Sequence, residues 1–212
     1  MLFYKFLSIL ARILDGLRSA GLPILAAILH GVAYVMYMFL VYDGDSVPNP
    51  ATWTVSAFLA SLNAITFAKG SKDLMAAAQF VVGSVGAIAV WCIALYAGTF
   101  APLDSLSQTM LVLCFLVIVV WKVTGFATYG NVVIALTVVA AIIPTIKGVW
   151  DDPSSETVLP WALWTFAFLA TICNVVRRKE EEHEVDWRLM LITPVTLLFA
   201  HAAVAGLAAR TL

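Results

Sequence analysis

Residues 160–179 read PWALWTFAFLATICNVVRRK, and this stretch decides how the chain folds. Its apolar run begins with Trp161 and Trp164, carries one amide at Asn174, and ends on the cationic triplet 177–179. A helix needs about 20 residues to cross the hydrocarbon core of a bilayer. The stretch therefore predicts a membrane-spanning helix with tryptophans near one surface and cations near the other.

Residues 50–69, PATWTVSAFLASLNAITFAK, form a weaker copy of the same stretch. Both copies contain Ala-Phe-Leu-Ala, at 57–60 and 167–170. Each copy also places a tryptophan ten positions before an asparagine, after a one-residue shift of the alignment. These pairs are Trp53 with Asn63 and Trp164 with Asn174. The repeat predicts a duplicated protein with related polar groups at equal depth in two helices.

The composition of the whole chain agrees with a membrane environment. Of its 212 residues, 62% are hydrophobic and 12% are charged, whereas a soluble domain carries about 25% charged residues. No basic block indicates nucleic-acid binding. The three cysteines, Cys92, Cys114 and Cys173, lie in apolar runs and fit neither a metal motif nor a disulfide framework. We therefore expect an all-α polytopic membrane protein without a metal site or cofactor.

Seven apolar segments with short connections are candidates for spanning helices. They lie at about 22–42, 51–68, 74–97, 105–121, 126–148, 158–176 and 188–209. Residues 1–19 are different, because their polar residues recur at three- and four-residue steps and so share one helical face. These polar residues are Lys5, Ser8, Arg12, Asp15 and Ser19. We expect residues 1–19 to form an amphipathic helix in the membrane interface.

Lysine and arginine are distributed unevenly between the two sides of these predicted spans. One side holds Lys5, Arg12, Arg18, Lys69, Lys72, Lys122, Arg177, Arg178, Lys179 and Arg188, and the other holds Lys147 and Arg210. Cytoplasmic loops carry an excess of Lys and Arg. We therefore expect a protein of the bacterial inner membrane, with a cytoplasmic N-terminus and an external C-terminus.

The repeat organises the predicted spans into two groups of three. The two copies fall in the second and sixth spans, which gives three-helix repeats over residues 20–97 and 125–212. Three helices reverse the direction of the chain, so a linker helix within 98–124 lets the second repeat run parallel to the first. Parallel repeats related by an axis along the membrane normal occur in some transporters. The expected architecture is therefore 3+1+3.

This layout, and the local pattern of residues 142–174, resemble a known transporter superfamily. The stretch IIPTIKGVWDDPSSETVLPWALWTFAFLATICN has a proline late in one helix, a short polar loop, then Leu-Pro-Trp and a closing asparagine. It resembles the second repeat of the SWEET, semiSWEET and PQ-loop superfamily and of the related PnuC-type vitamin transporters. Pro144 is followed by Thr145, so the Pro-Gln dipeptide of that superfamily is absent. The resemblance implies a passive carrier of a small polar solute.

The candidate substrate-binding residues are the polar and aromatic side chains within the predicted spans. An amide offers two donors and two acceptor lone pairs, which suits solute hydroxyls, and a tryptophan can stack on a ring. Intramembrane histidines are functional candidates by default. The candidates are Asn63, Asn174, Trp53, Trp161, Trp164, His30, His201 and Gln79. The alternatives are that the amides join helices, that the tryptophans form an interfacial belt, and that each histidine is neutral and bonded to a backbone carbonyl.

Prolines in or at the start of spans are candidate hinges, since a proline removes a backbone donor. These are Pro23, Pro50, Pro144 and Pro160. The leading hypothesis is a facilitator for a sugar, nucleoside or vitamin precursor that works by alternating access. The alternative is a non-transporting membrane subunit or scaffold that binds a partner protein. No constellation of residues indicates an enzyme, and association into a homo-oligomer stays open.

Overall fold

The computed structural model describes the backbone of residues 2–124, 130–179 and 187–211, and side chains within 20–69, 71–116, 118–119, 123, 132–178 and 190–211. All regular structure in this described part is helical. The helices are α1 (Leu2–Asp43), α2 (Pro50–Ser71), α3 (Ala78–Ala97), α4 (Ser105–Thr124), α5 (Gly130–Asp151), α6 (Val158–Lys179) and α7 (Trp187–Ala208). Two short 3-10 turns, η2 (Pro153–Ser155) and η3 (Ala209–Thr211), complete the fold.

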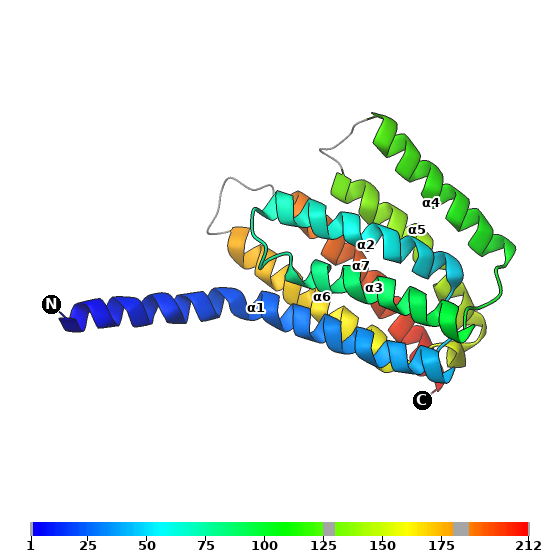
Figure 1. The fold of residues 1–212 in the computed structure, drawn as a ribbon, viewed down its shortest axis with the longest axis horizontal. Helices are drawn as coiled ribbons and strands as arrows, with labels where there is room; N and C mark the ends of the chain where they lie inside the picture. The colour runs from blue at the N-terminus through cyan, green and yellow to red at the C-terminus, as the bar shows by residue number, and fades with distance from the viewer. Residues whose placement is uncertain (1, 125–129, 180–186, 212) are drawn as a thin grey trace.

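Six of the helices contact one another in a closed ring, and Figure 1 shows α4 at the edge of the bundle away from α1. In the first half of the chain α3 lies between α1 and α2, and in the second half α7 lies between α5 and α6. The halves meet along two seams, where α1 packs on α6 and α2 packs on α5. Helix α4 lies outside this ring, against α5 and α2. The ring therefore has a centre that side chains from both halves can reach.

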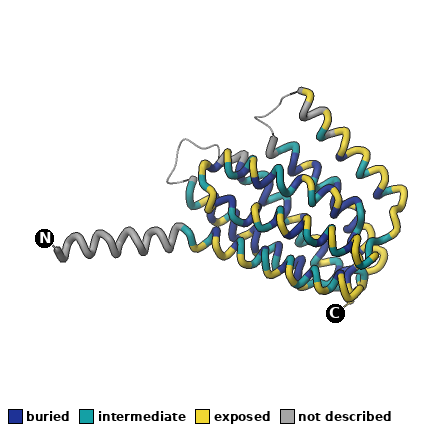
Figure 2. The backbone as a smooth tube through the Cα atoms, in the orientation of Figure 1, coloured by how far each residue is buried: buried dark blue, intermediate teal, exposed yellow. Residues whose placement is uncertain are grey.

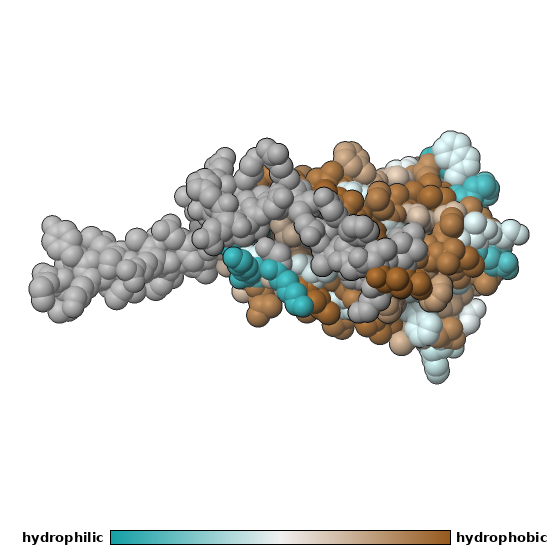
Figure 3. Space-filling view, turned by 90° about the horizontal axis from the view of Figure 1, so that it is seen from above, coloured by the Kyte–Doolittle hydropathy of each residue, from teal (hydrophilic) through white to brown (hydrophobic). Residues whose placement is uncertain are grey.

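The outward faces of the ring are apolar, as a lipid-facing surface requires. Burial alternates around each helix, and the exposed positions include Val35, Phe39, Val85, Phe166 and Phe199 (Figure 2). On the face seen in Figure 3, apolar residues cover most of the coloured surface, while hydrophilic residues gather at the right-hand end and one more lies beside the grey atoms. Six helices in the described part are long and apolar enough to span a membrane. The prediction of a polytopic membrane protein is confirmed at this level.

Two segments differ from the sequence-based prediction: α4, which is the fourth of the seven predicted spans, and the N-terminal part of α1. In α4, the described apolar segment is the shorter Ser105–Leu116, so a seventh span stays a prediction. Helix α1 is continuous from Leu2 to Asp43 and includes Pro23. The sequence predicts two separate helices here, at 1–19 and 22–42, whereas the structure has one. One proline removes one hydrogen bond, and the turns on either side continue. The side chains of residues 1–19 lie outside the described ones.

The third helix begins later than expected, at Ala78 rather than near residue 74. The reason is a turn built by Asp73, whose carboxylate accepts hydrogen bonds from the N–H groups of Met75 (2.7 Å) and Ala76 (3.3 Å). Helix α2 begins as expected, because the Asn49 side chain accepts from the N–H of Ala51 (2.9 Å) and Pro50 takes the first helical position.

Two glycines on α3 allow α1 to approach closely. A Cβ atom at Gly86 would lie 2.3 Å from the Tyr34 ring, and a Cβ atom at Gly83 would lie 2.9 Å from His30 Nε2. Side chains at these two positions would therefore push α1 away. The close approach places His30 and Tyr34 at the centre of the ring.

Candidate functional site

A cavity of about 70 Å³ lies at the centre of the ring. All six ring helices contribute to its lining, which comprises His30, Tyr34, Ser56, Leu59, Ala60, Asn63, Phe80, Gly83, Val138, Phe168, Leu197 and His201. A buried water needs about 10–15 Å³ by this kind of measure, so the space suits roughly five water molecules or a small solute. We call it the central cavity.

A second cavity of about 40 Å³ adjoins the first, toward the end of the bundle where α1 ends and α6 begins. The two share Tyr34, Ser56, Val138 and His201. The second cavity is walled by Trp53, Trp161 and Trp164, so we call it the tryptophan cavity. All three predicted tryptophans therefore lie inside the bundle, which excludes the interfacial-belt alternative for them.

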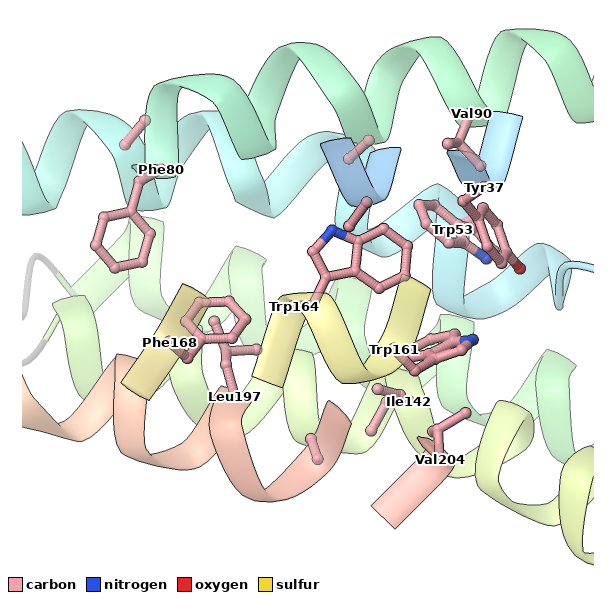
Figure 4. Packing of buried hydrophobic residues seen from close by; sticks show 14 of the residues in the cluster. Tyr37, Trp53, Phe80, Val90, Ile142, Trp161, Trp164, Phe168, Leu197 and Val204 are labelled. Carbon is pink, nitrogen blue, oxygen red and sulfur yellow. The ribbon is translucent and has the colours of Figure 1, made fainter. Parts of the chain in front are cut away.

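The tryptophans belong to a packed aromatic cluster that covers the central cavity on this side (Figure 4). The Tyr37 and Trp53 rings stack with centroids 4.9 Å apart, and the Trp161 and Trp164 rings meet edge to face at 5.1 Å. Trp53 and Trp164, the tryptophans of the two sequence copies, lie 6.1 Å apart across the centre. One tryptophan from each copy therefore lies at the centre of the ring, and the repeat itself stays a prediction.

Three buried polar atoms on the cavity walls have no hydrogen-bond partner among the described residues. They are Asn63 Oδ1, Trp53 Nε1 and Trp164 Nε1. Asn63 is 4% exposed and Trp164 is 1% exposed, and an unpaired buried polar group costs about 1–3 kcal/mol. A polar molecule that reaches these atoms from either cavity would relieve that cost.

The two predicted asparagines have different surroundings. Asn63 lines the central cavity, whereas Asn174 lines neither cavity and its Oδ1 accepts a hydrogen bond from the Arg177 guanidinium at 3.2 Å. Both are buried, so neither faces lipid. Of the two amides that the repeat places at equal depth, only that of Asn63 therefore lies on the central cavity.

The predicted histidines and Gln79 take three different roles. His201 lines both cavities, and its Nδ1 lies 2.7 Å from the carbonyl oxygen of Leu197, which is the backbone-bonded arrangement given as the alternative. His30 lines the central cavity, and Gln79 Nε2 lies 3.0 Å from its Nδ1. The Thr171 hydroxyl donates to Gln79 Oε1. Gln79 thus joins α1, α3 and α6 behind the cavity rather than lining it.

Sequence reasoning missed Glu156, which no motif in the chain singles out. Glu156 is 4% exposed, and it accepts hydrogen bonds from the Tyr37 hydroxyl (2.7 Å) and from Trp161 Nε1 (3.0 Å). Burial raises its pKa to about 8, although these hydrogen bonds oppose the rise. The sequence signal that could have pointed to this contact is a carboxylate, Glu156, five residues before Trp161 at the start of a helix. Its burial depends on Tyr37, which is 119 positions away.

At the opposite end of the bundle, apolar packing and an ion pair join segments that are distant in sequence. The Phe67 and Phe80 rings lie 4.3 Å apart, and Arg178 of α6 pairs with Asp73 in the turn before α3. Contacts of this kind therefore hold both ends of the bundle together.

Two of the predicted hinge prolines begin helices and two lie inside them. Pro50 and Pro160 are in the first turns of α2 and α6, while Pro23 and Pro144 are within α1 and α5. The Thr52 hydroxyl donates to the carbonyl of Ala141, one turn before Pro144, at 2.5 Å. The carbonyl that loses its helical donor to Pro144 is that of Ala140, so the Thr52 bond is a contact between α2 and α5 beside the proline. A hinge role for the four prolines stays a prediction.

The lining combines hydroxyl, amide, imidazole and indole groups with aliphatic walls, which can hold a neutral polar molecule through hydrogen bonds and ring contacts. We compared the chain with protein-family models, with curated protein sequences and with solved structures, and none of the three comparisons gives a match. What the cavity binds is therefore argued from its geometry.

Proposed function

We propose that the protein is a membrane carrier that moves a small, neutral, polar solute through the centre of the helical ring. The observation that carries the proposal is the central cavity, which all six ring helices line. We propose no enzymatic step.

The packing of the helices supports a 3+1+3 organisation within this proposal. Exchanging α1 with α5, α2 with α6 and α3 with α7 reproduces the main contacts: α1–α3 becomes α5–α7, α2–α3 becomes α6–α7, and the α1–α6 seam becomes α5–α2. Helix α4 has no counterpart and lies outside the ring, as a linker would. Opening would separate the halves along the two seams. The same pattern supports the resemblance to the SWEET and PQ-loop superfamily as an architecture.

The chemistry of the lining defines the class of solute. Hydroxyls or amides on the solute would pair with Asn63, Ser56 and the indole N–H groups, and a ring would contact the tryptophans. The two cavities together hold only a few water molecules. A sugar, nucleoside or vitamin precursor would therefore need the seams to widen. We propose the N-terminus on the cytoplasmic side, because Lys69, Lys72 and Arg177–Lys179 lie at one end of the ring and Lys147 and Arg210 at the other.

Purified protein in proteoliposomes tests this function. A thermal-shift screen over sugars, nucleosides and vitamin precursors selects a labelled solute, and uptake is then measured with Asn63→Ala. Gln108→Ala is the matched control, because Gln108 is an exposed amide on α4 outside the ring. We expect Asn63→Ala to lower uptake about tenfold at solute concentrations well below saturation, and Gln108→Ala to keep it. Uptake that is unchanged after the loss of the Asn63 amide would overturn the proposed site.

The alternative function, a subunit or scaffold, is favoured by one observation. Helix α4 packs only on one side of the bundle and exposes Val112, Phe115 and Val123. A second protein or a second copy of the chain on this face would make the molecule a scaffold. Co-purification of a partner that is lost with Phe115→Ser, together with no uptake of any screened solute, would favour this alternative.

A further inference from the structure

Glu156 lies at the point where the two halves of the ring are joined at one end. The Tyr37 hydroxyl reaches its Oε1 from α1, and Trp161 Nε1 reaches its Oε2 from α6. A single buried carboxyl group therefore joins α1 to the first turn of α6.

The two loops at this end are also bound directly to each other. The Val47 N–H donates to the carbonyl of Ser155 at 2.9 Å, and the Thr157 N–H donates to Ser46 Oγ at 3.2 Å. Tyr37 and Trp161, which bind Glu156, are at the same time part of the aromatic cluster over the cavities, and their polar atoms point toward the same end (Figure 4). This end of the bundle opens only if the contacts around Glu156 are broken.

We propose that Glu156 is a proton-binding latch: the closed end holds it as the neutral acid, and opening exposes it to water, where it ionises. The step is a simple dissociation, in which the carboxylic acid O–H bond breaks and the proton passes to water. Closing reverses it and takes one proton from the solvent. This inference goes beyond the proposed transport, and its test needs no solute.

The neighbours of Glu156 offer no cation to hold it as a carboxylate. The titratable and charged groups on the described elements around it are Tyr37 on α1, Asp45 in the loop, Asp152 before η2, His201 on α7 and Arg210 on η3. The Asp152 carboxylate accepts from the N–H of Ser154, and the Arg210 guanidinium donates to the carbonyls of Val149 and Trp150. The two groups that bind the Glu156 side chain directly are a phenol hydroxyl, from Tyr37, and an indole N–H, from Trp161.

The direction of the pH dependence follows from the two environments. In the closed end burial raises the pKa of Glu156 to about 8, whereas a glutamate in water has a pKa of about 4.3. Between these values the closed form binds more protons than the open form, so a rise in pH favours opening by linkage. The opening equilibrium rises by up to tenfold per pH unit across this window and levels off above it.

Hydrogen–deuterium exchange of the Val47 and Thr157 amides measures this opening in the full-length protein in nanodiscs. Each wild-type rate is divided by the rate of Glu156→Gln at the same pH, which cancels the intrinsic pH dependence of exchange. We expect the ratio to rise steeply between pH 5 and pH 8, because glutamine imitates the neutral acid and does not titrate. A ratio that is flat, or that falls as pH rises, overturns the latch.

Two further variants make the result specific to Glu156. Tyr37→Phe removes a hydrogen bond that favours the ionised form, so the levelling-off should move to higher pH than in the wild type. Asp151→Asn neutralises an exposed carboxylate nearby, which pairs with Lys147, and should keep the wild-type profile. If Asp151→Asn abolishes the pH dependence or Tyr37→Phe leaves its position unchanged, the proton is bound elsewhere and the latch is wrong. Loss of uptake alone would bear on transport and leave the latch intact.

Discussion

Helices α2 and α6 carry two copies of one sequence pattern, and the structure places their tryptophans alike and their asparagines differently. Trp53 and Trp164 meet at the centre, each with an unpartnered indole N–H among the described residues. One turn beyond Asn63 lies Thr66, whose hydroxyl donates to the backbone carbonyl oxygen of Asn63. Thr66 therefore does not occupy the side-chain amide of Asn63. One turn beyond Asn174 lies Arg177, which binds the amide itself.

This difference shows that a sequence repeat sets the depth of a residue along its helix. It does not set whether the side chain is free to bind a molecule in the cavity. Equal spacing from the tryptophan gives both amides the same rise of about 15 Å. Which partner each amide finds is decided by the side chain three positions later, because residues at i and i+3 are neighbours on a helix. The four predictions below test how far the two helices are equivalent.

The largest effect should come from the tryptophans. Trp53→Ala and Trp164→Ala should each lower the free energy of unfolding by about 3–5 kcal/mol, because each leaves a large void in the buried aromatic cluster. Thermal or denaturant unfolding in detergent measures both, with the lipid-facing Phe199→Ala as the control. A large loss for one tryptophan and a negligible loss for the other would end the claim that the two positions are equivalent.

The next effect concerns the polar contacts that each helix makes with α3. Thr171→Val in α6 leaves Gln79 Oε1 without its donor in a buried site, so we expect a loss of about 1–3 kcal/mol in unfolding free energy. Ser61→Ala in α2 removes a contact to Ser84 (2.7 Å) that is only partly buried, and its loss should be smaller. Equal losses by thermal unfolding would contradict the difference in burial.

Substitution of the two asparagines should have different effects on the affinity for the solute. Asn63→Ala should weaken the affinity for the transported solute about tenfold, which corresponds to one hydrogen bond of about 1.4 kcal/mol. Asn174→Ala should leave the affinity within about twofold, since this amide lines neither cavity. Isothermal titration with the selected solute measures both. If Asn174→Ala proves the more harmful variant, the central cavity is not where the solute binds.

The smallest effect should be at the ion pair that ties α6 to the turn after α2. Burial by itself would raise the pKa of Asp73, but hydrogen bonds from the Met75 N–H, Arg178 and the Ala76 N–H outweigh it and hold the pKa below its usual value. A carboxyl group with a lowered pKa stabilises the fold at neutral pH, and this contribution is lost as pH falls through that lowered pKa. The pair is partly exposed, so Asp73→Asn should cost only about 1 kcal/mol at pH 7.

Thermal unfolding of Asp73→Asn at pH 7 and at pH 3 provides the measurement. The difference from the wild type should shrink at the lower pH, because the wild-type carboxylate is then being protonated. A difference that grows on acidification would show that the Asp73 side chain stabilises the turn in its neutral form.

Much of the helical arrangement could be predicted because long apolar runs and their ends are local properties. Pro50 with Asn49 before it, and Leu-Pro-Trp at 159–161, mark where α2 and α6 begin. The continuity of α1 could not be read in the same way. A proline and a change from amphipathic to apolar pattern indicate a break, but neither forces the helix to end.

The candidate site was predictable only in its residue types. Trp53, Trp164, Asn63, His30 and His201 are unusual within apolar spans, so composition alone points to them. Tyr34 and Tyr37 are not unusual there, and Glu156 looks like any loop acid. Their roles arise from contacts between α1 and α6, which no local pattern in the chain encodes.

The glycines of α3 determine where the helical bundle can separate. The His30 and Tyr34 rings of α1 occupy the space that the missing side chains of Gly83 and Gly86 leave. Sliding α1 along α3 would therefore make these rings clash with the α3 backbone. Any parting of the bundle must therefore leave this pair intact and run between α1 and α6 or between α2 and α5. Two methyl groups, added as Gly83→Ala and Gly86→Ala, would be expected to loosen a whole half of the protein rather than a single contact.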